Sequence, residues 1–475
     1  MRRLLGAAIA AALCGGCASP PSPPQPALEL PAAWAVEAPW RAGRPDDAAP
    51  KGAWWRRFDD PRLDALARQA TASSPTLDIA AARLAQARAS LSSASAALWP
   101  QVGLNARAVR QRISANRPLT NYASQNFATV QNDFVLSMAV GYELDLAGRV
   151  QSTVEGASAA VEQSAADLEN TRLVLTTDLA TAYFNLRAVD TELDAVARSI
   201  TLQRRALDLV SSRHQLGAAT GLDVAQQQAL LDTTLVQVDV LKRQRGLFEH
   251  AIATLTGTPA PAFALAPDLR PLPPPAVPLG VPSDVLERRP DVASAQRAMA
   301  VANAQVGVAR AAFFPSITLG PALGVESRAL SSLFDAPSLL WSFGVSATQV
   351  LFDRGRLKAN EQFAQAGHQA AVANYRRVVL GAMQEVQDGI SGLAALDRAS
   401  TQARSAVATA GRVLDMATAR YEGGASAYLD VIGAQQALLA SERQAAQLDG
   451  QRLLTTVFLI KALGGDWQRG TSVGE

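Results

Sequence analysis

The sequence predicts a membrane protein of the α+β class, in which one chain carries two repeats of a β-hairpin followed by long helices. Three observations support this. The same motifs occur twice in the same order. Two long stretches without proline carry apolar residues at every seventh position, and a shorter stretch before each alternates large apolar with small or polar residues. Four strands are too few to close a barrel, so the pattern also predicts assembly from several copies.

The chain begins with an export signal. Two arginines precede the apolar stretch 4–13, which is too short to span a bilayer. Small residues then lead to Cys17, and a proline-rich run follows it. This arrangement resembles the bacterial lipoprotein signal, which implies that residues 1–16 are removed and that Cys17 becomes the acylated first residue. A plain signal peptide with an incidental cysteine is the alternative.

The composition excludes several classes of function. Lysine and arginine (44) nearly balance aspartate and glutamate (42), and there is no basic block, so nucleic acid is not an expected partner. The three histidines, His214, His250 and His368, lie too far apart in sequence to suggest a metal site. No phosphate loop, serine elbow or paired-carboxylate motif is present. The sequence therefore predicts neither an enzyme nor a bound cofactor.

Matched spacings define the duplication. Pro75 and Pro100 are 25 residues apart, as are Pro290 and Pro315 (100 − 75 = 25 and 315 − 290 = 25). A later pair of motifs also matches, from Arg213 to Leu222 and from Arg420 to Leu429 (222 − 213 = 9 and 429 − 420 = 9). The predicted division of the chain is an N-terminal segment 17–74, repeat 1 over 75–258, a linker 259–289, repeat 2 over 290–465 and a C-terminal tail 466–475.

Each repeat is predicted to contain a long helical hairpin, over 148–258 in repeat 1 and 354–465 in repeat 2. Prolines, which break helix interiors, are absent between Pro118 and Pro259 and after Pro337. Apolar residues recur at seven-residue intervals, which is typical of helices that supercoil around one another. A helix from Arg149 to Arg213 would be ~98 Å long at ~1.5 Å per residue.

Glycines mark the turn of each hairpin. Gly217 and Gly221 in repeat 1, and Gly423 and Gly424 in repeat 2, are of the type that ends a helix. Two carboxylates, Asp223 and Asp430, follow in the predicted first turn of the returning helix, where they would meet the positive end of its dipole. Each helical hairpin is therefore expected to end in one free tip.

The two β-hairpins are predicted over about 101–147 and about 316–353. Between 134 and 146, large apolar residues alternate with small or polar ones, as in a strand with lipid on one side and water on the other. A soluble hairpin with one packed face is the alternative. Open strand edges are not tolerated in lipid, so the chain would share a barrel with other copies, and three copies would supply twelve strands.

Taken together, the motifs resemble the TolC-like outer-membrane efflux channels, and more narrowly the lipoprotein branch that serves tripartite resistance-nodulation-division pumps. The residues that carry the resemblance are the segments 54–61, 144–149, 351–356, 420–421 and 429–431. The resemblance implies a homotrimer in the bacterial outer membrane. Its twelve-stranded β-barrel would continue into a twelve-helix α-barrel in the periplasm, with an equatorial belt from about Leu28 to Ser74, from the linker and from the tail.

The resemblance also implies a passive duct that exports drugs or other small toxic compounds. The expected partners are a periplasmic adaptor protein and a proton-driven inner-membrane pump. The adaptor would contact the tips at Leu216, Gly217, Gly221, Leu222, Gly423 and Gly424. The periplasmic gate would involve Leu429, Tyr421, Arg420 and Asp430.

Gly433 occupies a position where relatives often have aspartate, which favours an apolar gate at Leu429. Two alternatives remain open from the sequence, a type I protein-secretion duct and a coiled-coil protein of the envelope that transports nothing.

Overall fold

The computed structural model describes residues 52–115, 129–277 and 288–465. The predicted signal peptide, Cys17 and the C-terminal tail lie outside these residues. The chain divides into two compact units. Unit 1 contains the described parts of Arg83–Ser164 and Ala295–Tyr375, and unit 2 contains those of Leu28–Ala82, Ala165–Ser294 and Arg376–Glu475.

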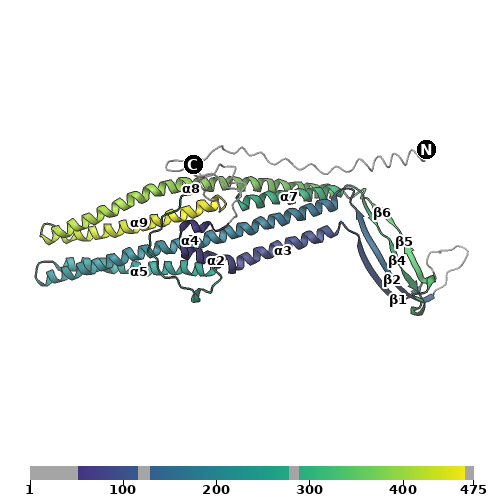
Figure 1. The fold of residues 1–475 in the computed structure, drawn as a ribbon, viewed down its shortest axis with the longest axis horizontal. Helices are drawn as coiled ribbons and strands as arrows, with labels where there is room; N and C mark the ends of the chain where they lie inside the picture. Colours follow the sequence, from purple (N-terminus) through teal and green to yellow (C-terminus); the bar gives the residue numbers. More distant parts are fainter. Residues whose placement is uncertain (1–51, 116–128, 278–287, 466–475) are drawn as a thin grey trace, which may run out of the picture. The chain divides into compact units, whose positions relative to one another are not determined.

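The two repeats have helices of equal length. Repeat 1 contains α3 (Pro75–Ala96), α4 (Arg149–Gln215) and α5 (Gly221–Leu255), and repeat 2 contains α7 (Pro290–Ala311), α8 (Arg356–Glu422) and α9 (Tyr428–Ala462). The matching pairs have 22, 67 and 35 residues. The offset from α4 to α8 equals that from α5 to α9 (356 − 149 = 207 and 428 − 221 = 207). Figure 1 shows both helical hairpins.

The strands form one antiparallel sheet in unit 1. Its members are β1 (Gln101–Ile113), β2 (Thr129–Leu144), β3 (Ser316–Leu319), β4 (Ala322–Ser327), β5 (Leu339–Ser342) and β6 (Val345–Thr348). The strand β1 pairs with β2, and β2 pairs with both β3 and β4. The last two pairs are β3 with β6 and β4 with β5. The sheet therefore has the width of four strands.

Each strand of the second predicted hairpin is interrupted, which the sequence pattern did not predict. One break falls at Gly320 and Pro321, and the other at Phe343 and Gly344. Proline cannot donate a ladder hydrogen bond. The pairing across the first break is kept by the Pro321 carbonyl, which accepts a 2.8 Å hydrogen bond from the amide of Val140.

The strand register gathers large apolar side chains on one face of the sheet. Residues directly opposite each other in an antiparallel sheet point to the same face. One row across all four strand widths contains Leu104, Met138, Leu323 and Trp341. Their exposed fractions are 75%, 46%, 50% and 74%, so no part of the chain that the structure describes covers this row. Within the described residues, no helix is long and apolar enough to cross a membrane.

The core of unit 2 lies where the short N-terminal elements meet the long helices. The 3₁₀ helix η1 (Trp54–Phe58) and helix α2 (Pro61–Ser73) bury aromatic and aliphatic side chains against α4 and α9. The Phe58 ring packs against that of Phe184 at an angle of 42°, with ring centroids 4.7 Å apart. The Trp54 indole donates a hydrogen bond to the Thr176 hydroxyl at 3.1 Å.

A buried ionic network anchors the linker to this core. Asp60 accepts hydrogen bonds from the Tyr183 hydroxyl at 2.7 Å and from the Arg187 guanidinium at 2.8 Å. Arg187 also lies 3.8 Å from the carboxylate of Asp268 in the linker. Hydrogen bonds from Arg270 hold the pKa of Asp268 well below its usual range. Because each buried charge has an opposite partner, the network fixes the path of the linker.

Candidate functional site: the tips of the helical hairpins

The turn between α4 and α5 is closed by backbone and side-chain caps. Gly217 has a φ of 76°, a left-handed conformation that glycine adopts without strain. The amide of Ala218 donates to the carbonyl of Arg213 at 2.8 Å, which ends the helix. Thr220 and Asp223 form a reciprocal capping box that starts α5.

The turn between α8 and α9 has the same backbone but lacks the side-chain cap. Gly424 has a φ of 75°, and the amide of Ala425 donates to the Arg420 carbonyl at 2.8 Å. The N-cap of α9 is Ala427, which has no side-chain oxygen to accept a hydrogen bond. The start of α9 is therefore held less firmly than the start of α5.

The other two predicted turn glycines have different roles. Gly221 is the first residue of α5, and Gly423 lies in the turn without a positive φ. Only Gly217 and Gly424 therefore adopt the left-handed conformation expected of a helix-ending glycine.

Arg213 of repeat 1 holds the end of α8 in repeat 2. Its guanidinium donates to the carbonyls of Tyr421 and Glu422 at 3.3 and 3.2 Å. It also lies 5.0 Å from the centre of the Tyr421 ring, a cation–π distance. The Tyr421 ring packs against that of Tyr428 with centroids 4.8 Å apart. Arginine therefore neutralises the carbonyl end of α8 and links the two tips.

A buried amide network makes a second link between the repeats. The Tyr428 hydroxyl donates to the Gln227 carboxamide oxygen at 2.9 Å. The Gln227 nitrogen donates to the Gln203 backbone carbonyl at 3.0 Å and to the Gln435 side-chain oxygen at 3.3 Å. Burial raises the pKa of the Tyr428 hydroxyl, so it remains a protonated donor. Because these polar groups are buried, the network is stable only in the arrangement in which every hydrogen bond is formed.

The predicted gate residues divide between surface and interior. Leu429 is 59% exposed, and Asp430 beside it in the first turn of α9 is also exposed. The Arg420 guanidinium donates to the carbonyl of Ala425 at 3.3 Å, inside its own turn. Tyr421 is buried, and its hydroxyl has no hydrogen-bond partner among the described residues. Of the four, Leu429, Asp430 and Arg420 are exposed and only Tyr421 is buried.

The predicted adaptor-contact residues lie at the turn of each helical hairpin. Leu216 and Leu222 are 84% and 65% exposed, although both are large and apolar. Leucines with this much exposure at a helix end favour contact with another protein surface.

Sequence reasoning missed the links between the repeats, which are made by the half-buried Arg213 and by the buried Gln227, Tyr428, Gln203 and Gln435. Tyr428 could have been found, because it precedes Leu429 and begins the returning helix. Gln227 could not, because it stands in a run of three glutamines and only the packing of α5 shows which of them is buried.

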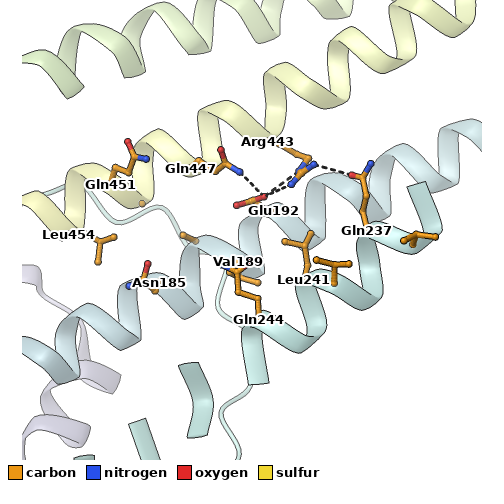
Figure 2. Close-up of a pocket in the computed structure, with 14 residues that line it drawn as sticks. Asn185, Val189, Glu192, Gln237, Leu241, Gln244, Arg443, Gln447, Gln451 and Leu454 are labelled. Atoms are coloured by element: carbon orange, nitrogen blue, oxygen red, sulfur yellow. Dashed lines mark hydrogen bonds and ion pairs between the residues drawn. The ribbon is translucent and has the colours of Figure 1, made fainter. Parts of the chain in front are cut away.

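A further joint connects the repeats along α4 and α9. Figure 2 shows Glu192 of α4 accepting hydrogen bonds from Arg443 at 3.2 Å and from Gln447 at 3.1 Å. Arg443 also donates to the side chain of Gln237 in α5 at 3.2 Å. These residues line a cleft of about 510 Å³ between α4, α5 and α9. The described residues contain no group of side chains suited to hold a metal ion.

Comparisons with known proteins agree with this arrangement. The family model described as "Outer membrane efflux protein" matches residues 66–258 and 281–465. The pyoverdine export outer membrane protein OpmQ of Pseudomonas aeruginosa is 33% identical, with 96% of this chain and 95% of OpmQ covered. The toluene efflux pump outer membrane protein TtgF of Pseudomonas putida is 31% identical, with 98% of each chain covered. The solved structure of the outer-membrane channel OprN is 28% identical, with a TM-score of 0.84 and coverage of 93% of this chain and 99% of that one.

A sheet with one uncovered apolar face, joined to paired long helices, defines the class of TolC-like outer-membrane channels. The chain belongs to the outer membrane efflux protein family. It is the outer-membrane channel component of an efflux pump, located in the outer membrane and extending into the periplasm. Members of the family are channel proteins.

Proposed function

We propose that three copies of this chain form a passive duct that carries small toxic compounds from an inner-membrane pump to the cell exterior. The observation that carries the proposal is the sheet of unit 1. Its outer strands, β1 on one side and β5 with β6 on the other, each pair along only one edge among the described strands. Lipid does not tolerate open edges, so neighbouring copies must complete the barrel.

The size of the barrel follows from the width of the sheet. One copy contributes the width of four strands, so two copies would give eight and three would give twelve. A barrel of about eight strands is filled by its own side chains. Twelve strands leave room for a water-filled passage, which favours a homotrimer.

We propose that the tips are both the gate and the adaptor-contact surface. Leu429 would meet its two counterparts on the axis and form an apolar constriction, with Asp430 beside it. Arg420 and Tyr421 would support the turn that carries them, since Arg420 bonds within the turn and Tyr421 packs against Tyr428. Leu216 and Leu222, with Gly217, Gly221, Gly423 and Gly424 in the turns, would contact a periplasmic adaptor.

The energy and the choice of cargo would come from the partners. A wide passage contacts its cargo weakly, so selection belongs to a proton-driven pump in the inner membrane. The relatives are named for different cargoes, pyoverdine for OpmQ and toluene for TtgF. We therefore propose a broad class of small organic compounds rather than a folded protein.

A deletion strain tests the proposal. Loss of the gene should increase sensitivity to a panel of antibiotics, dyes, detergents and solvents, and the wild-type gene should restore resistance. Unchanged sensitivity together with a loss of one secreted protein would instead support a type I secretion duct. Native mass spectrometry of the detergent-extracted protein should show three copies, and a stable monomer would contradict the trimer.

Lipidation at Cys17 remains a prediction from the sequence, since this residue lies outside the described residues. The change Cys17→Ala should abolish incorporation of labelled palmitate, because no other cysteine remains after removal of the signal. The measurement is metabolic labelling followed by immunoprecipitation. Labelling that survives the change would contradict the assignment.

A further inference from the structure

The hairpin of β1 and β2 has one end next to the helices and one end away from them. The strand β1 begins at Gln101, after α3, and β2 ends at Leu144, before α4. The far ends of the two strands are at Ile113 and Thr129. Since the helices of the channel extend into the periplasm, the far ends of β1 and β2 face the cell exterior.

One face of β2 is apolar over the thickness of a membrane. Every second residue from Phe134 to Leu144 is apolar or aromatic. These residues are Phe134, Leu136, Met138, Val140, Tyr142 and Leu144. The ten steps between the first and the last (144 − 134 = 10) cover ~33 Å along the strand at ~3.3 Å per residue. At a tilt of ~45° this length gives a height of ~23 Å, close to the ~25 Å apolar band of outer-membrane barrels. The external edge of the lipid-facing band therefore lies at Phe134 and at Ala108, which pairs with it.

Two arginines follow on the same face, directly beyond this edge. Arg110 and Arg112 of β1 pair with Asn132 and Val130 of β2, and all four residues are exposed. Residues two positions apart in a strand lie on one face, about 7 Å from each other. The strand β4, which also pairs with β2, ends one row earlier and does not reach them. Arg110 and Arg112 therefore lie at the height where the hydrocarbon of the bilayer ends and the lipid headgroups begin.

The other arginine of β1 lies on the opposite face and has a partner inside the chain. Arg107 is an odd number of positions from Arg110, so its side chain lies on the other face of the sheet. Its guanidinium donates a 2.6 Å hydrogen bond to the carboxylate of Asp133. Among the residues that the structure describes, no ion pair or side-chain hydrogen bond joins Arg110 or Arg112 to another residue. Positive charges at the headgroup level without a carboxylate beside them favour an anion from the membrane.

The chemistry of the two side chains favours a phosphate. A guanidinium presents parallel N–H donors that match two oxygens of one phosphate group. A phosphomonoester carries close to two negative charges at neutral pH, so it attracts arginine more strongly than a phosphodiester does. In the outer membrane, the leaflet that faces the exterior contains a glycolipid whose sugar headgroup carries phosphomonoesters.

We propose that Arg110 and Arg112 form a binding site for lipopolysaccharide, the phosphorylated glycolipid of the outer leaflet. The two guanidiniums bind the phosphates of its headgroup, and the apolar band that begins at Ala108 and Phe134 contacts its acyl chains. Every copy of the chain carries one such site. The inference goes beyond the proposed duct and rests on it in one respect, namely that this face of the sheet is the outside of the barrel.

Titration of the purified protein with lipid A, the membrane anchor of lipopolysaccharide, tests the site. The full-length protein is extracted in detergent, freed of bound lipid and mixed with diphosphoryl lipid A, and the lipid-bound fraction is measured by native mass spectrometry. The double variant Arg110→Gln with Arg112→Gln should bind about 25-fold more weakly than wild type, since each basic residue near an anionic lipid surface contributes about fivefold. Wild type should bind monophosphoryl lipid A more weakly than the diphosphoryl form, whereas the double variant should bind both equally.

Three further variants control for charge and for assembly. Lys242→Gln with Arg243→Gln removes two exposed positive charges from α5 in unit 2 and should bind diphosphoryl lipid A as wild type does. Arg110→Lys with Arg112→Lys keeps the charges but not the paired donors, so its affinity should fall between those of wild type and the glutamine variant. The single variant Arg112→Gln serves if the double variant fails to assemble, and it should weaken binding about fivefold.

Several results would overturn the site. The first is equal affinity of wild type and the double glutamine variant for diphosphoryl lipid A. Binding of phosphatidylglycerol as tightly as lipid A would overturn the assignment to the glycolipid. The third result concerns Asp335, which is exposed in the loop between β4 and β5. If Asp335 of a neighbouring copy were the anion, Asp335→Asn and the double glutamine variant would lower the dissociation temperature of the trimer equally and leave lipid affinity unchanged.

The number of copies in the same spectra separates this inference from the proposed duct. Trimers that bind lipid A and lose it in the double glutamine variant would support both. A monomer whose lipid A binding depends on Arg110 and Arg112 would contradict the trimer and retain the site. A trimer whose lipid A binding is independent of these arginines would retain the trimer and overturn the site.

Discussion

At the scale of single residues, the tip of repeat 2 combines an exposed apolar side chain with a buried polar link. Leu429 projects from the first turn of α9, and Tyr428 beside it points inward to Gln227. Under the proposed function, the Leu429 side chain would face the passage, while the Tyr428 side chain holds the helix that carries both residues. The two residues can be tested separately.

Replacement of the exposed leucine should widen the passage. Leu429→Ala should raise single-channel conductance in a planar bilayer, because three copies would each remove a branched side chain from the axis. Leu222→Ala is the matched control, since Leu222 is the equivalent residue of repeat 1 and is also exposed. Equal conductance for Leu429→Ala and wild type would remove Leu429 from the gate.

Replacement of the buried tyrosine should loosen the tip without altering its surface. Tyr428→Phe removes the donor to Gln227 and leaves a buried oxygen without a partner, at a cost of about 1–3 kcal/mol. We expect a higher open probability in bilayer recordings and faster proteolysis at the turn. Tyr375→Phe, in the part of α8 that belongs to unit 1, should change neither. No effect from Tyr428→Phe would show that the amide network does not hold the tip.

The residues of the site differ in how far sequence could identify them. Leu429 and Arg420 were assigned to the gate from the resemblance to the TolC-like channels, and the duplicated spacing from Arg213 to Leu222 shows only that they lie at the turn of repeat 2. The link from Tyr428 to Gln227 joins residues far apart in sequence, and no local pattern marks it. The same holds for Asp60, Arg187 and Asp268, whose meeting depends on where the linker crosses α4.

At the scale of elements, the equal hairpins depend on one glycine in each turn. The predicted helical hairpins end at residues 258 and 465, three residues beyond the observed ends of α5 at Leu255 and α9 at Ala462 (258 − 255 = 3 and 465 − 462 = 3). Helix ends were predictable because glycine and proline act on the local backbone. The strand breaks at Gly320 and Gly344 were not predictable from the sequence, because a glycine also fits the small-residue face of an alternating strand.

Two glycines of α8 and its turn should respond oppositely to alanine. Gly424→Ala places a β-carbon on a left-handed residue and should destabilise the protein by about 1 kcal/mol. Gly411→Ala lies inside the helix with open space around it and should stabilise the helix by about 0.5–1 kcal/mol. The measurement is the midpoint of thermal unfolding followed by circular dichroism. A shift of the same sign in both variants would contradict the assigned turn geometry.

At the scale of the whole molecule, stability at low pH should depend on the linker anchor. The pKa of Asp268 is lowered in the folded state by hydrogen bonds from Arg270, so its charged form stabilises the fold above its usual pKa of 3.8. This contribution is lost as the pH falls through the lower folded-state pKa. The network of Asp60, Arg187 and Asp268 should therefore weaken in acid.

The variant Asp268→Asn tests this dependence. It should reduce the free energy of unfolding by about 1.5–3 kcal/mol at pH 7, because the hydrogen bonds lose their charge. The difference from wild type should shrink as the pH falls below about 4, because the carboxyl of the unfolded chain then takes up a proton while the folded carboxyl, whose pKa is lowered, still keeps its charge. Thermal midpoints at pH 7, 5 and 3 give the comparison, with exposed Asp78→Asn as control. A difference that stays constant with pH would contradict this role.

The identical lengths of the paired helices have a consequence for how this gene can change. The helices α4 and α8 both have 67 residues, and α5 and α9 both have 35. Deletion of one codon in one repeat would shorten one of its helices, so that the helices of the two repeats no longer match in length. The same mismatch in length would be present in every copy of the assembly. Length changes are therefore expected to survive only as coordinated events in both halves of the gene, while point substitutions accumulate independently in each.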